Sequence, residues 1–161
     1  MSRGRPRLSL SIQYAVAARG LPARALLRRW VRAALLPRTR RAVITLRFVG
    51  PAEGRELNWR YRSRRHATNV LSFVYDDERG TCGGDIVLCA QVLRREAAAQ
   101  GKPVTAHCAH LVVHGMLHLQ GADHGNPDDA ARMEARESAI LARLGFPDPY
   151  RPHSDDARSR R

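Results

Sequence analysis

The stretch His-Gly-Met-Leu-His-Leu-Gln-Gly-Ala-Asp-His, residues 114–124, fixes both a helix and a candidate metal site in this 161-residue chain. His114 and His118 are four residues apart, so on a helix their rings leave the same face, at roughly 5–6 Å between Cβ atoms. Both rings can then reach one metal ion at about 2.0–2.1 Å. Gly121 can adopt a positive φ, which ends the helix and returns His124 toward the same ion. Three imidazole ligands leave a fourth position open, as in a catalytic zinc site.

The same spacing occurs in the metzincin peptidases, whose pattern is H-E-x-x-H-x-x-G-x-x-H. Gly121 falls where that pattern has its glycine, but Gly115 stands where the peptidases carry their general-base glutamate. Without this carboxylate, the peptidase mechanism has no proton acceptor. We therefore predict one zinc ion per chain, which nickel could replace, in a cage without peptidase chemistry. The alternative is three histidines in a buried helix and turn with no metal.

Three motifs, in order along the chain, resemble those of a known family. Residues 56–62 and 68–73 resemble L-N-x-x-[YF]-R followed by T-[DN]-V-L-S-F, and residues 84–88 resemble a G-D-I strand. The histidine stretch resembles H-G-x-L-H-L-x-G-x-D-H. Together they resemble the YbeY endoribonucleases, bacterial proteins of ribosomal RNA maturation. The chain departs at Val74, where the family usually has proline, and at Ala122, where it often has an aromatic residue.

The resemblance implies a fold, an activity and partners. The fold is α+β, a small mixed four-stranded sheet packed with about five helices, with the metal site on a central helix and the following turn. The activity is that of a metal-dependent single-strand endoribonuclease in 16S rRNA maturation and ribosome quality control. The partners are ribosomal RNA, the small ribosomal subunit and its associated proteins. Arg62 matches the family's arginine near the metal, where a guanidinium could hold the scissile phosphate.

Two candidate catalytic residues keep more than one interpretation. Arg62 is either this phosphate-binding group or one surface arginine among many. Asp123 could orient a ligand imidazole, accept a proton, or serve only in the turn. Asp85, His107 and His110 are interpreted as hydrogen-bonded structural residues, although the two histidines could be alternative ligands.

Composition agrees with a nucleic-acid partner. The formal charge of +13 and the pI near 11.3 favour a polyanion, with a membrane surface or a merely solvated basic surface as alternatives. The three cysteines are an odd number without a C-x-x-C pair, which favours reduced thiols in the cytoplasm. No apolar run is long enough to span a membrane. Two rival functions remain: an RNA-binding ribosome-assembly factor, and a zinc hydrolase of another class.

Hydrophobic periodicity predicts strands before helices, which is typical of an α+β domain. We expect a disordered basic arm at residues 1–7, one domain at 8–146 and a disordered tail at 147–161. Trp59 is expected in the core. The predicted strands are residues 8–16, 42–49, 69–75 and 84–89. The predicted helices are one starting near Pro22, then residues 53–62, 91–100 and 103–119, and a last one capped by Asn126 with Pro127 in its first turn.

Overall fold

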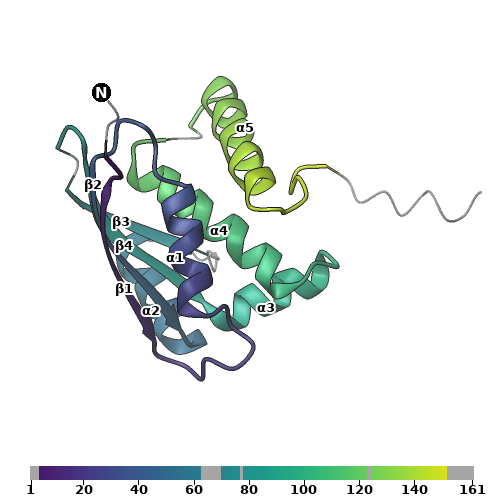
Figure 1. Ribbon diagram of the computed structural model, residues 1–161. Helices are drawn as coiled ribbons and strands as arrows, with labels where there is room; N and C mark the ends of the chain where they lie inside the picture. The colour runs from purple at the N-terminus through teal and green to yellow at the C-terminus, as the bar shows by residue number, and fades with distance from the viewer. Residues whose placement is uncertain (1–3, 63–69, 77, 123–124, 152–161) are drawn as a thin grey trace, which may run out of the picture.

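The computed structural model describes residues 4–62, 70–76, 78–122 and 125–151 (Figure 1). Within these ranges the chain forms four strands and five helices. They are β1 (Arg7–Tyr14), α1 (Arg24–Ala33), β2 (Arg41–Val49), α2 (Pro51–Arg62), β3 (Val70–Asp76), β4 (Thr81–Cys89), α3 (Ala90–Ala99), α4 (Val104–Leu119) and α5 (Pro127–Arg143). The predicted α+β class, with a four-stranded sheet and five helices, is confirmed.

The sheet is mixed, with the strand order β1-β2-β4-β3. β1, β2 and β4 run parallel, and β3 pairs antiparallel with β4. Side chains of β2 alternate between exposed and buried positions in its first half, as expected for a strand with one face on the core. Gly84 has no room for a side chain, because a Cβ there would lie 2.3 Å from the carbonyl oxygen of Phe73. The glycine in β4 therefore allows the backbone of the antiparallel edge strand β3 to lie close to this position.

Helix α4 is the centre of the molecule, and α1, α3, α5 and the sheet all pack against it (Figure 1). It is apolar on nearly every side, which is the pattern of a fully surrounded helix. Gly115 faces β4, and a Cβ at this position would lie 3.2 Å from two side-chain carbons of Ile86. α5 lies on the far side of α4 from the sheet, at the top of Figure 1. None of the described helices is both long and apolar enough to cross a membrane.

Helix ends follow the sequence signals closely apart from the starts of α1 and α2, and α2 begins at Pro51, two residues before the predicted position 53. Asn126 caps α5 as predicted, and its side chain accepts a hydrogen bond of 2.9 Å from the amide of Asp129. The start of α1 differs, because the helix begins at Arg24 and not at Pro22. Pro22 is buried, and its carbonyl accepts a hydrogen bond of 2.7 Å from the Tyr14 hydroxyl. That tertiary contact holds the proline before the helix.

The prediction that Trp59 lies in the core is wrong, because its side chain is 68% exposed. α2 packs on a small second cluster built from Val49, Leu71, Val87, Cys89 and Val92, and Leu57 is its contact there. The described fold also extends past the predicted domain bounds of 8 and 146. β1 begins at Arg7, and Asp148 accepts a hydrogen bond of 3.0 Å from Ser138 on α5.

Candidate metal centre

The described part of the candidate metal site is the pair His114 and His118 on the last two turns of α4. Their Nε2 atoms are 3.1 Å apart, and the ring centroids are 4.6 Å apart. Two nitrogen ligands at 2.0–2.1 Å in a tetrahedral site are separated by about 3.3 Å. The two nitrogen atoms therefore already lie at a distance that fits a single ion. Gly121 has a φ of 93°, so the predicted left-handed turn follows the helix.

A carboxylate that the sequence analysis missed holds His114 of this pair in place. Glu137 on α5 is completely buried. It accepts hydrogen bonds from Nδ1 of His114, from Nε2 of His110 at 3.0 Å, and from the Tyr150 hydroxyl. Since a carboxylate only accepts, Nδ1 of His114 carries the proton and Nε2 keeps its lone pair toward His118. A carboxylate that fixes the tautomer of a ligand imidazole is a regular feature of protein metal sites.

The same hydrogen bonds keep Glu137 ionised. Burial alone raises the pKa of this carboxyl, but the bonds from His110, His114 and Tyr150 outweigh it and lower the pKa to about 2. Burial and the neighbouring carboxylate raise the pKa of the Tyr150 hydroxyl, which therefore stays a donor. One sequence signal could have found Glu137: it stands in the apolar stripe of α5, between Met133 and Ile140.

At its C-terminal end, α4 is tied to the connection between α1 and β2 by the buried side chain of Gln120. Its Oε1 atom accepts from the backbone amide of Leu36 and from the Thr39 hydroxyl, both at 2.8 Å. Its Nε2 atom donates to the carbonyls of Ala34 and Met116, at 2.8 and 2.9 Å. All four hydrogen-bonding positions of the amide are used. Arg38, in the same connection, donates to the backbone carbonyl of Gln120.

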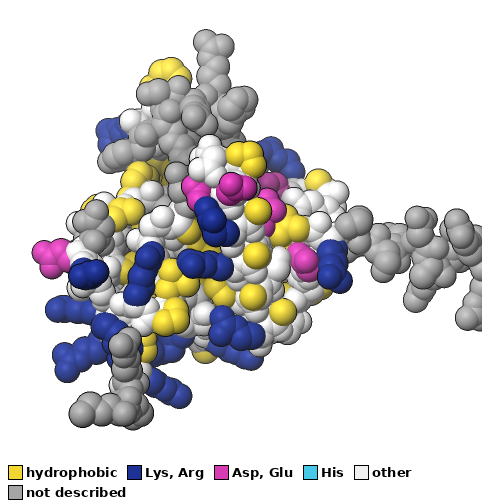
Figure 2. All heavy atoms as spheres, turned by 90° about the horizontal axis from the view of Figure 1, so that it is seen from above, with side chains coloured by type: hydrophobic (Ala, Val, Ile, Leu, Met, Phe, Trp, Pro, Cys, Tyr) yellow, Lys and Arg dark blue, Asp and Glu magenta, His cyan; other side chains and the backbone are white. Residues whose placement is uncertain are grey.

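This connection forms one wall of an open groove that reaches His118. The groove has a volume of about 1240 Å³, and Arg38, Arg40 and Arg79 line it. Their guanidinium groups give this side of the candidate site a positive field. Figure 2, which looks down on the α5 end of the molecule, shows many more basic than acidic side chains on that face.

The sequence-predicted site residues divide into two groups. His114 and His118 are brought together, and Arg62 is the last residue of α2. Asp123 and His124 lie outside the described residues, so their roles stay predictions. Among the residues that the structure describes, no third histidine, cysteine or carboxylate completes a metal-binding group.

His110 and Asp85 form hydrogen bonds, as the sequence suggested, and His110 bonds Glu137 and Tyr150. His107 differs from the prediction: it is buried, but its Nε2 atom lies 3.8 Å from a carboxylate oxygen of Glu96, which is beyond hydrogen-bond distance. Asp85 accepts a hydrogen bond of 2.5 Å from the Tyr75 hydroxyl. Cys82, Cys89 and Cys108 are buried.

These features define a small α+β protein whose central helix presents a histidine pair, backed by a buried glutamate, beside a basic groove. Residues 20–145 match the family described as Endoribonuclease YbeY. The endoribonuclease YbeY of Aromatoleum aromaticum is 54% identical over 147 residues, which cover 89% of this chain and 93% of that protein. The endoribonuclease YbeY of Laribacter hongkongensis is 55% identical over 148 residues and 89% of both chains.

The chain belongs to the YbeY endoribonuclease family. A solution structure of a Thermotoga maritima protein shares the fold, with a TM-score of 0.52 and 19% identity. It covers 88% of this chain and 99% of its own length.

Proposed function

We propose that this protein is a metal-dependent endoribonuclease that cuts single-stranded regions of ribosomal RNA during 16S rRNA maturation. The observation that carries the proposal is the pair of Nε2 atoms of His114 and His118, 3.1 Å apart, with Nδ1 of His114 held by Glu137. The basic groove beside His118 fits a polyanionic substrate. Relatives more than half identical to this chain bear the name endoribonuclease.

His114, His118 and His124 are the residues that would hold the ion, with zinc the first candidate and nickel a substitute. A bound divalent ion supplies Lewis-acid chemistry at a phosphate oxygen. The remaining roles fall to side chains of this chain. Arg62 would hold the scissile phosphate and offset its charge in the transition state. Asp123 would either orient a ligand imidazole or accept a proton.

The partners in this proposal are ribosomal RNA, the small ribosomal subunit and its proteins, in the cytoplasm. A second candidate is an RNA-binding assembly factor with little nuclease activity, which the basic groove alone would support. A peptidase is disfavoured by Gly115, because the general-base glutamate is missing there and even a Cβ at this position would lie 3.2 Å from Ile86 of β4.

Cleavage of a structured ribosomal RNA precursor by zinc-loaded protein separates the first two candidates. We expect the His114→Ala protein to bind the precursor but not to cut it. We expect Arg62→Ala to keep its fold and its zinc but to lose about 2–4 kcal/mol of transition-state stabilisation, as when one oxyanion donor is removed. Equal cleavage by wild-type and His114→Ala protein would contradict the metal-dependent mechanism. Tight binding without cleavage by the wild type would favour the assembly factor.

A further inference from the structure

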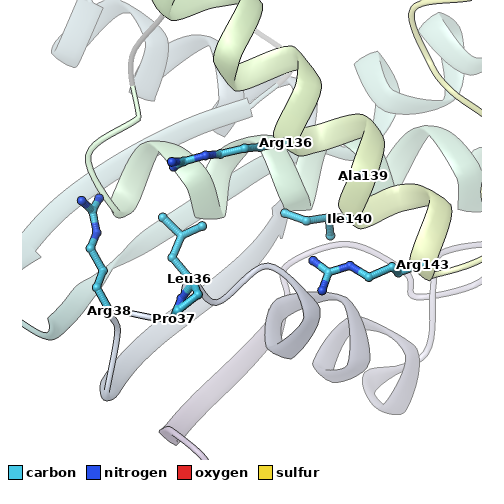
Figure 3. A pocket seen from close by; sticks show the side chains of 7 residues that line it. All are labelled: Leu36, Pro37, Arg38, Arg136, Ala139, Ile140 and Arg143. Atoms are coloured by element: carbon cyan, nitrogen blue, oxygen red, sulfur yellow. The ribbon is translucent and has the colours of Figure 1, made fainter.

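A pocket of about 360 Å³ lies between α5 and the connection from α1 to β2 (Figure 3). Its lining has two parts, an apolar floor and a basic rim. Leu36, Pro37, Ala139 and Ile140 are apolar, and Arg38, Arg136 and Arg143 supply the rim. Figure 3 shows the three guanidinium groups around the same opening, with Arg136 and Arg143 coming from α5 and Arg38 facing them. Its volume is within the range of small-ligand sites.

The two rim arginines of α5 differ from the third arginine on the same helix. Arg132, one turn before Arg136, forms an ion pair of 2.7 Å with Asp129. Among the described residues, Arg136 and Arg143 have no ion pair with a carboxylate. Two or more guanidinium groups without carboxylate partners around one opening form a site for an anion, because each has donors that match phosphate oxygens.

The pocket also adjoins the groove at the candidate metal centre, since one residue lines both. Arg38 lines both cavities, and the groove contains His118. Arg38 is fixed at the junction by its bond to the backbone of Gln120. An RNA strand that passes His118 would therefore reach Arg38 next and then the pocket.

We propose that this pocket binds one unstacked nucleotide of the RNA strand that passes His118, at a distance from the bond to be cut. Arg136 and Arg143 hold its phosphates, and the base lies on the apolar floor. Proteins that bind single-stranded RNA commonly take up unstacked bases and contact the phosphates with basic side chains. The inference rests on the proposed function, since it extends the path of the same RNA. The shared arginine favours RNA over an acidic peptide, because a peptide would have no reason to continue into the groove.

The first test compares the salt dependence of RNA binding by two double variants of the full chain. The pocket variant is Arg136→Ala with Arg143→Ala. The control is Arg132→Ala with Arg151→Ala, which removes the same charge from two exposed arginines that pair with neighbouring carboxylates. The ligand is a fluorescent, unstructured RNA of about 20 nucleotides, longer than the roughly 4–16 of a typical single-strand site. Anisotropy is measured with zinc-loaded protein at low temperature, and a gel verifies that the RNA is intact.

We expect the slope of log Kd against log salt to fall by about 1.4 in the pocket variant, at about 0.7 per lost phosphate contact. This corresponds to roughly 20-fold weaker binding at 0.1 M salt, and the control should stay close to the wild type. If pocket variant and control bind RNA alike, the inference is overturned. An acidic peptide that binds the wild type but not the pocket variant, with RNA binding unchanged, would overturn it in favour of a protein partner.

A second test changes the pocket itself without removing an arginine. Ala139 is exposed on α5 and lines the pocket. Ala139→Glu places a carboxylate among the guanidinium groups, where it would pair with them and repel phosphate. Ala139→Gln is the neutral control of the same size and similar helix propensity. We expect the glutamate variant to bind RNA at least tenfold more weakly than the glutamine variant, and equal affinities would overturn the inference.

Cleavage assays distinguish this inference from the proposed function. The pocket variant should raise KM for long strands and leave kcat unchanged, because the pocket contributes binding away from the reacting bond. Short strands that end before the pocket should show no difference from the wild type. If the wild type cuts RNA but the pocket variant shows neither effect, only the inference fails. If the wild type itself does not cut, the proposed function fails.

Discussion

Two buried polar side chains hold α4 at opposite ends of the histidine pair, and they do so by different means. Glu137 carries a charge, and its partners are two imidazoles and a phenol. Gln120 is neutral, and three of its four partners are backbone groups. The charged side chain therefore sets protons and ring orientations, whereas the neutral one sets the path of the main chain. Substitutions at the two positions should separate metal affinity from stability.

Gln120→Ala should have the largest effect on stability. It leaves the Leu36 amide and the Ala34 carbonyl without their partner, so we expect a loss of about 3–5 kcal/mol in the free energy of unfolding. Urea unfolding measures it, and Gln91→Ala on the exposed side of α3 is the control. Zinc affinity of the folded fraction should change little. A loss below about 1 kcal/mol would show that water replaces the amide at no cost.

Glu137→Gln should have the opposite pattern. The amide can no longer accept from every partner, so the ring of His114 loses its fixed tautomer. We expect zinc affinity to fall about 10–100-fold, as when such supporting carboxylates are removed elsewhere. Competition with a chromophoric chelator measures it, and Glu134→Gln, on an exposed face of the same helix, is the matched control. An unchanged zinc affinity would show that Glu137 is only a structural residue.

Tyr150→Phe should have a smaller effect in the same direction as Glu137→Gln. It removes one of the three hydrogen bonds to the carboxylate and leaves the bonds from both imidazoles. We expect zinc affinity to fall by about threefold to tenfold, the size of one hydrogen bond. The same chelator competition measures it. A loss as large as that of Glu137→Gln would mean that the tyrosine, and not the histidine bonds, determines where the carboxylate lies.

The smallest expected effect concerns His107, which lies on the same stripe of α4 as His110 but outside both networks. Burial lowers its pKa below 6.5, and the neighbouring Glu96 only partly offsets this. The unfolded chain therefore takes up the proton before the folded one, and stability falls as the pH drops below about 6.5. His107→Gln should flatten this acid-side decline by less than about 1.4 kcal/mol per pH unit. Urea midpoints at several pH values measure it, and parallel curves for both proteins would contradict the assignment.

The parts of the fold that the sequence predicted depend on local signals. Asn126 and Pro127 start α5, Gly121 makes the turn after α4, and alternating side chains mark β2. Family motifs placed the histidine pair. Pro22 and Trp59 were misjudged because packing between elements decides them. Pro22 bonds Tyr14 of β1, and Trp59 is exposed on a helix that packs through Leu57.

The supporting residues of the site could not be read in the same way. Gln120 bonds residues 81 to 86 positions away, and no local pattern reports such a distance. Glu137 is 23 positions from His114, but the sequence does carry a signal for it, because a carboxylate in the apolar stripe of a helix needs hydrogen-bond partners. A charged residue inside the buried face of a helix is thus a better signal of a site than a polar residue in a turn.

Because Gly115 packs tightly on Ile86, the effect of a substitution at position 115 depends on the residue at position 86. A larger residue at 115 would lie within 3.2 Å of Ile86, so that side chain or α4 itself would have to shift by a few tenths of an ångström. Shortening the side chain at 86 would make room for a larger residue at 115, but shortening it first would leave a cavity. The two changes are each harmful alone, so their combined effect should deviate from additivity. The contact between Gly115 and Ile86 therefore separates this protein from the peptidase pattern by more than one substitution, although the two motifs differ at one position.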